Sequence, residues 1–94
     1  MKQISEQDKK EIRRAAREAV AQCLIAGHFT AAVGKMGEVF YNPRKPINWE
    51  TVSEQLDEMD NYVVTALTTL RVARAEMKFI KTKQLELKGP RKAE

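Results

Sequence analysis

The chain has 94 residues, of which 43% are hydrophobic and 32% charged, and its formal net charge is +4. This length suits one domain with a modest core, and the composition is typical of a soluble helical protein rather than a disordered one. A single cysteine excludes an internal disulfide. Together with the lack of a signal peptide and of an apolar run of about 20 residues, this predicts a cytoplasmic protein with no membrane segment.

The first predicted helix covers residues 5–26. Ser5 is a good N-cap, and Asp8 three residues later completes a short form of the capping box. Gly27 is expected to end the helix. Apolar residues recur at steps of four and three and predict one contact stripe of mostly small side chains: Ile12, Ala16, Ala19, Cys23 and Ala26.

A second, shorter helix is predicted over residues 30–41, with Thr30 as its cap. Gly34 and Gly37 each lower its intrinsic helicity by about 1 kcal/mol relative to alanine. Tertiary packing is therefore needed to hold this helix. The connector that follows contains Pro43 and Pro46 and is expected to be non-helical.

The long helix predicted over residues 48–88 organises the chain. Asn48 is its expected N-cap, and Gly89 with Pro90 ends it, leaving residues 89–94 as a mobile basic tail. Its apolar residues repeat every 3.5 positions on average, a period that suits left-handed helix packing. This predicted seam consists of Trp49, Val52, Leu56, Met59, Val63, Ala66, Leu70, Ala73, Met77, Ile80 and Leu87, and only Gln84 interrupts it.

The predicted fold class is all-α, with two shorter helices packed against one long heptad-patterned C-terminal helix, in a helical-bundle or coiled-coil oligomer. The two shorter helices, laid end to end, could nearly cover the seam within one chain. Alternatively, they cover half of it and a second chain covers the rest. We favour a homodimer, and an antiparallel one, because the acidic residues between Glu50 and Asp60 would then lie near the basic second half of the helix.

No set of residues predicts catalysis, a metal or a cofactor. Cys23 and His28 are the only classical sulfur and nitrogen ligands, and a structural zinc site takes four. We expect Cys23 to be a small core residue and His28 to cap the carbonyls of a helix end. The carboxylates Asp57, Glu58 and Asp60 are explained by a solvated helix face. The chain is therefore expected not to be an enzyme.

The basic residues are the best functional signal in the sequence. They form one stripe on the first predicted helix and a second on the long helix: Lys9, Lys10, Arg13, Arg14 and Arg17, and then Arg71, Arg74, Lys78 and Lys81. Such stripes can follow nucleic-acid phosphates with an affinity that falls as salt rises. A solvated charged face explains the same residues equally well.

The sequence is compatible with three functions. The first is a small basic oligomer that binds nucleic acid through its phosphate backbone without enzymatic activity. The alternative is a non-enzymatic protein-binding module or inhibitor, docked by its helices on a larger protein, with Phe40, Tyr41, Arg44 and Trp49 as anchors. The third is a structural subunit that acts only in assembly.

Overall fold

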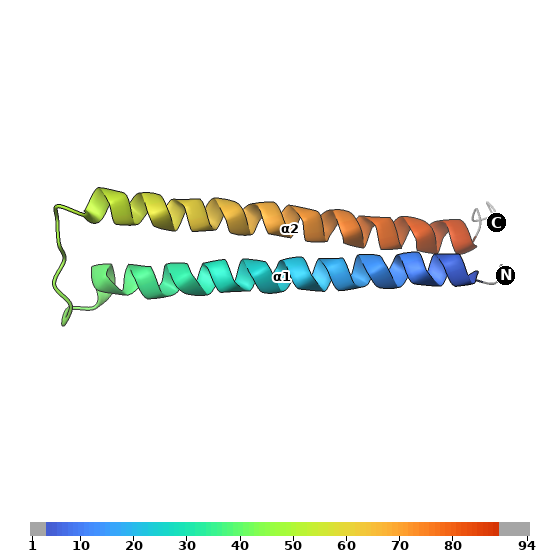
Figure 1. Ribbon diagram of the computed structural model, residues 1–94, viewed down its shortest axis with the longest axis horizontal. Helices are drawn as coiled ribbons and strands as arrows, with labels where there is room; N and C mark the ends of the chain where they lie inside the picture. Colours follow the sequence, from blue (N-terminus) through green and yellow to red (C-terminus); the bar gives the residue numbers. More distant parts are fainter. Residues whose placement is uncertain (1–3, 89–94) are drawn as a thin grey trace, which may run out of the picture.

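The computed structural model describes residues 4–88, so the predicted tail at 89–94 lies outside the described residues. The described part contains two helices and no strand: α1 (Glu6–Tyr41) and α2 (Val52–Lys88). Figure 1 shows an antiparallel hairpin in which the start of α1 lies beside the end of α2. The Cα extents are 64 × 29 × 20 Å. The predicted all-α class is confirmed, but the division into three helices is wrong.

The two helices predicted over residues 5–26 and 30–41 form one continuous helix, Glu6–Tyr41, and Gly27 does not end it. The hydroxyl of Thr30, the predicted cap, instead donates a hydrogen bond back to the Gly27 carbonyl at 3.0 Å. On either side of this point α1 is held by α2. Ala26 is buried, and the ring of Phe29 lies 5.5 Å from that of Tyr62. Tertiary packing thus overrides the weak helix propensity of glycine.

Both ends of α1 match the sequence prediction. The Asp8 amide donates to the Ser5 hydroxyl at 3.1 Å, which confirms Ser5 as the N-cap. At the other end, Asn42 is extended, because the Pro43 ring disfavours helical geometry at the residue before it. Its backbone N–H still donates to the Glu38 carbonyl at 2.8 Å. The helix therefore ends at Tyr41, as predicted.

Helix α2 begins at Val52, four residues later than predicted. Asn48 closes a turn in front of the helix. Its side-chain oxygen accepts from the Glu50 amide at 3.2 Å, and its carbonyl accepts from the Thr51 amide at 3.1 Å. The first helical hydrogen bond follows, from the Gln55 amide to the Thr51 carbonyl at 3.0 Å. Asn48 thus organises the approach to α2 rather than its first turn.

The register of the hairpin is set by two contacts. Lys83 Nζ lies 2.9 Å from Asp8 Oδ1, and the ring of Tyr62 packs at a tilt against that of Phe29. A step of 21 residues along α1 therefore matches a step of 21 residues back along α2. This register sets small side chains opposite one another along the contact between the helices. Within residues 4–88, the buried residues are all alanines: Ala15, Ala19, Ala26, Ala66 and Ala73.

The predicted seam of α2 is divided into two rows by its contact with α1. One row is buried or half-buried: Val52, Met59, Ala66, Ala73, Ile80 and Leu87. The other row is 39–50% exposed and consists of Leu56, Val63, Leu70 and Met77. Trp49 precedes α2 and is 76% exposed. One neighbouring helix covers only one side of such a seam. The second row of α2 residues that contact α1 lies outside the predicted seam and is largely polar: Gln55, Tyr62, Thr69, Glu76 and Lys83.

The predicted stripe of α1 is also partly wrong. Ile12, Ala19 and Ala26 face α2, but Ala16 and Cys23 are exposed. The contact residues next to them are Ala15 and Gln22. Alanine occupies both positions 15 and 16, so the apolar pattern alone does not distinguish them. The choice depends on which side of α1 meets α2.

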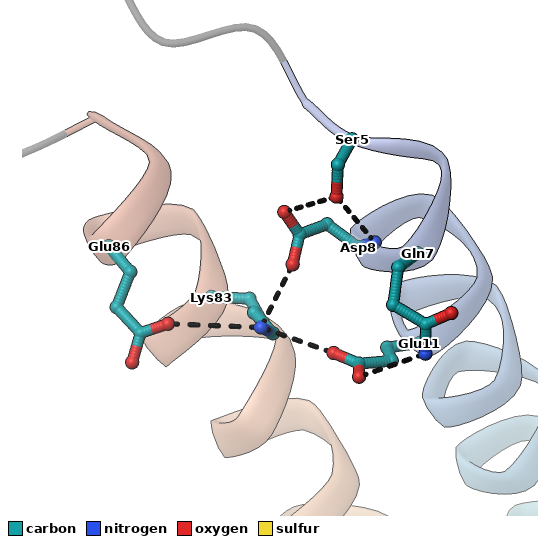
Figure 2. A network of polar contacts seen from close by, with 6 residues as sticks. All are labelled: Ser5, Gln7, Asp8, Glu11, Lys83 and Glu86. Carbon is teal, nitrogen blue, oxygen red and sulfur yellow. Dashed lines mark hydrogen bonds and ion pairs between the residues drawn. The ribbon is translucent and has the colours of Figure 1, made fainter.

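Lys83 holds the open end of the hairpin together, as Figure 2 shows. Its amino group lies 2.9 Å from Asp8 Oδ1, 3.1 Å from Glu11 Oε2 and 4.0 Å from Glu86 Oε2. Hydrogen bonds from Lys83 lower the pKa of the Asp8 and Glu11 carboxyls below their ordinary values. The same two carboxylates raise the pKa of Lys83.

Candidate functional site

The antiparallel hairpin brings the two predicted basic stripes to the same end of the molecule. By the register given above, residues 9–17 of α1 lie level with residues 74–82 of α2. Figure 1 shows these two segments side by side near the open end of the hairpin, opposite the loop. Basic residues that are about 60 positions apart in the sequence thus share one region of the structure, which we call the basic end.

Two of these basic residues are engaged by nearby groups. Arg14 Nη1 donates to Glu76 Oε2 at 2.9 Å, and its guanidinium lies 5.8 Å from the centre of the Phe79 ring. Lys9 Nζ lies 3.2 Å from Glu6 Oε1 on the same helix. Arg14 therefore helps to hold the two helices together, and its charge is matched within the hairpin.

The other predicted basic residues remain available to a partner. Within residues 4–88, none of them has an acidic group within 4.0 Å, and all are exposed: Lys10, Arg13, Arg17, Arg71, Arg74, Lys78 and Lys81. The steps of three and four between them produce a strip of charge along each helix. We call these the α1 strip (Lys10, Arg13, Arg17) and the α2 strip (Arg71, Arg74, Lys78, Lys81).

The outermost residues of the two strips, Lys10 and Arg17 on α1 and Arg71 and Lys78 on α2, occupy opposite edges of the hairpin. Arg13, Arg74 and Lys81 directly follow contact residues and therefore lean toward one common side. Lys10 and Arg17 are two residues away from contact residues of α1, a rotation of about 200°, and so face away from α2. Arg71 and Lys78 face away from α1 for the same reason. Arg74 and Lys78 border a shallow depression of about 230 Å³ around Met77. The structure therefore places the strips level with each other without merging them into one patch.

The predicted protein anchors lie at the opposite end, around the loop. Tyr41 is 68% and Trp49 is 76% exposed, Arg44 is exposed, and Phe40 is half-buried. The aromatic residues border an open hollow of about 490 Å³. The structure thus brings Phe40, Tyr41 and Trp49 together, about the length of the hairpin away from the basic end.

The expectations for Cys23 and His28 are wrong. Cys23 is exposed rather than in the core, and His28 is exposed in the middle of α1 rather than at a helix end. Within residues 4–88, no three His, Cys, Asp or Glu side chains are grouped so that they could hold a metal ion. Neither helix of this part of the chain is both long and apolar enough to span a membrane.

Sequence reasoning missed two features of these surfaces. The pairing of Arg14 with Glu76 joins residues 62 positions apart, and no local pattern signals it. The exposure of one row of the α2 seam was also missed, because the apolar pattern was interpreted as a single contact surface. This row consists of Leu56, Val63, Leu70 and Met77. The two rows of the seam, each with a period of seven, were the signal that could have separated them.

No protein family, curated protein or solved structure matches this chain. The function is therefore inferred from the charges and exposed side chains of the hairpin itself.

Proposed function

We propose that this protein is a non-enzymatic nucleic-acid-binding protein that contacts the phosphate backbone with the basic end of its hairpin. The observation that supports it is that the α1 and α2 strips lie level with each other near one end of the hairpin, with seven exposed cations that have no acidic partner within 4.0 Å in residues 4–88. Arginine and lysine rows of this kind bind phosphates and release counterions.

The distribution of charge supports the same proposal. The loop half of α2 carries Glu54, Asp57, Glu58 and Asp60, so the rod is polarised along its length. A polarised rod is steered so that its basic end approaches an anionic surface first. Two helices side by side, within a body at least 20 Å thick, are also too wide for the roughly 12 Å major groove of B-DNA. Contact with the backbone, without base readout, is the mode that fits this shape.

The test is a salt titration of duplex binding. In the first variant, the α1 strip is neutralised as Lys10→Gln, Arg13→Gln and Arg17→Gln. Each lost phosphate contact lowers the slope of log affinity against log salt by about 0.9. We expect the triple change to flatten the slope by about 3 units, without preference for any duplex sequence.

The matched control removes the same number of charges from the loop end, as Lys35→Gln, Arg44→Gln and Lys45→Gln. All three side chains are exposed. If the basic end is the site, the control keeps most of the salt slope of the wild type. Equal loss in both variants would mean that net charge alone is responsible, and would contradict the proposal.

A second candidate function, protein binding at the loop end, is favoured by one observation. Tyr41 and Trp49 stand exposed around the open hollow next to the loop. Large exposed aromatic residues are enriched among the residues that dominate protein interfaces. Trp49 is the only tryptophan of the chain, so its fluorescence reports on this end alone. A partner captured after nuclease treatment should shift that emission and lose binding to Trp49→Ala.

Self-association is part of the proposed function. Leu56, Val63, Leu70 and Met77 keep the seven-residue period of a helix contact, yet α1 leaves them 39–50% exposed. Contiguous exposed apolar side chains of this kind mark sites of association. We expect the wild-type protein to be a dimer by light scattering at tens of micromolar, and a monomer there would contradict this part of the proposal.

A further inference from the structure

Within residues 4–88, one side of the hairpin carries six of the large exposed apolar side chains, more than any other side. A residue that directly follows a contact residue is rotated by about 100° around its helix. Because α1 and α2 are antiparallel, this rotation leads to the same side of the hairpin for both. Residues at such positions form what we call the apolar face: Ala16, Val20, Cys23, Leu56, Val63, Leu67, Leu70 and Met77.

The opposite side is different. Its large exposed apolar residues are Ile25 and Val72, and it also carries the pair between Arg14 and Glu76. The hairpin is 64 Å long and at least 20 Å across, so either side is large enough for the roughly 800 Å² that each partner contributes to a standard interface. Only the apolar face combines that size with a continuous apolar row.

We infer that the apolar face binds a second copy of this chain, with the two α2 helices antiparallel and their two-fold axis at Leu67. This inference rests on the self-association proposed above, and it does not depend on nucleic acid. It engages Arg74, so the other six residues of the two strips remain for phosphate contacts in the dimer. In this arrangement Leu67 meets Leu67 of the second copy. To within one residue, Val63 then lies opposite Leu70, and Leu56 opposite Met77.

Charge complementarity selects this register. Asp60 and Arg74 belong to the same row as Leu67, seven residues before and after it. An axis at Leu67 sets Asp60 of each copy opposite Arg74 of the other copy, so the dimer contains two such pairs. A shift of half a heptad in either direction would set these charges against leucine, valine or methionine. That arrangement leaves a charge without a partner beside apolar groups and is strongly disfavoured.

The packing inside the hairpin follows the same rule. Ala19 lies level with Ala73, and Ala26 with Ala66, to within one residue. Equivalent rows of the two antiparallel helices thus already meet each other in this protein. On the α1 side of the apolar face, a Cβ added at Gly27 or Gly34 would have no neighbouring atom within 4 Å, so the second α1 has room to approach.

The arrangement is tested by disulfide trapping, since only a residue on the two-fold axis meets itself. Leu67→Cys is introduced into a Cys23→Ser background, and Val64→Cys in the same background is the control. The two native side chains are similarly exposed, at 49% and 52%, but Val64 faces away from α1, outside the apolar face. A disulfide needs Cα atoms about 4.4–6.8 Å apart. Mild oxidation should link Leu67→Cys into a dimer and leave Val64→Cys unlinked.

A charge exchange gives a second, independent readout. Asp60→Arg and Arg74→Asp should each raise the dimer dissociation constant by about tenfold or more, because each change places like charges together twice per dimer. The double variant restores opposite charges and should return close to the wild-type value in sedimentation equilibrium. A double variant as weak as the single ones, or equal trapping of both cysteine variants, would overturn this geometry. A wild-type monomer would instead overturn the self-association on which it rests.

Discussion

At the scale of single residues, two polar side chains on the same contact row of α2 are in opposite situations. Lys83 is held by Asp8 and Glu11 of the other helix. The Gln55 side-chain oxygen is buried and has no hydrogen-bond partner in the described part of the chain. The ion pairs of Lys83 fix the register of the hairpin, whereas the unpaired carbonyl oxygen of Gln55 destabilises the fold.

The first prediction concerns the pH dependence of stability. Because Lys83 lowers the pKa of Asp8 and Glu11, their contribution is present at neutral pH and is lost as the pH falls below about 4, through the folded-state pKa values. Lys83→Met should lower the Tm at pH 7 and should shrink the drop in Tm between pH 6 and pH 3. Thermal melts across this range measure both effects.

Lys81→Met is the matched control for this prediction. Lys81 is exposed on the same turn and has no acidic group within 4.0 Å in residues 4–88. The Lys81→Met variant should therefore keep the wild-type dependence of Tm on pH. If Lys83→Met and Lys81→Met respond to acid alike, the contacts of Lys83 do not stabilise the hairpin in solution.

The second prediction is that Gln55→Met stabilises the hairpin. The change removes an unpaired buried carbonyl oxygen and keeps an unbranched side chain, so the free energy of unfolding should rise by about 1 kcal/mol. Gln22→Met is the comparison, because the Gln22 amide donates to Glu18 at 2.9 Å. Urea unfolding should show a gain only at position 55. A gain of equal size at both positions would point to helix or packing effects instead.

At the scale of the elements, α1 spans 36 residues although it contains three glycines. Gly34 has open space where a side chain would start, while a Cβ at Gly37 would lie 3.2 Å from the end of the Met59 side chain. The glycine at position 37 thus makes room for a residue of α2, and the glycine at position 34 has no such role within the hairpin.

The third prediction follows from this contrast. Gly34→Ala should raise the free energy of unfolding by about 1 kcal/mol, because alanine has the higher helix propensity and meets no neighbour. Gly37→Ala should give a smaller gain or a loss, since Met59 must shift to admit the methyl group. Chemical denaturation of the two variants in parallel measures the difference, and equal gains would show that Met59 moves freely.

At the scale of the whole molecule, the hairpin is a rod with a basic end, an aromatic loop end and an apolar face between them. Its interior is thin, because the buried residues of the described part of the chain are alanines. Such a core buries little apolar area, which at about 25 cal/mol per Å² limits its stability. Covering the apolar face with a second copy would add the larger side chains of α2 to the core.

The fourth prediction separates assembly from folding of the hairpin. Leu70→Asp places a charge on the apolar face and should convert the dimer to a monomer while the protein stays helical, because Leu70 is 39% exposed in the hairpin itself. Leu85→Asp, at a residue 60% exposed on another side, should leave the dimer intact. Light scattering and circular dichroism on both variants report the two properties. A dimeric Leu70→Asp would show that another surface is used.

Local chemistry determined much of the fold from the sequence alone. Ser5 and Asp8 marked the start of α1, and Pro43 marked its end, because capping and the constraint before proline act within a few residues. The seven-residue period also indicated which side of α2 is apolar. The basic stripes were visible for the same reason, since steps of three and four define a helix face without any knowledge of the partner helix.

The tertiary structure decided what depends on contacts between distant residues. Gly27 lies inside α1 because packing against α2 outweighs about 1 kcal/mol of local propensity. Ala15 rather than Ala16 enters the core, and Lys83 finds Asp8 at a separation of 75 residues. The split of the seam into a covered and an exposed row has the same origin. One helix can bury only the row it faces, and the choice of row is a property of the pair of helices rather than of either one.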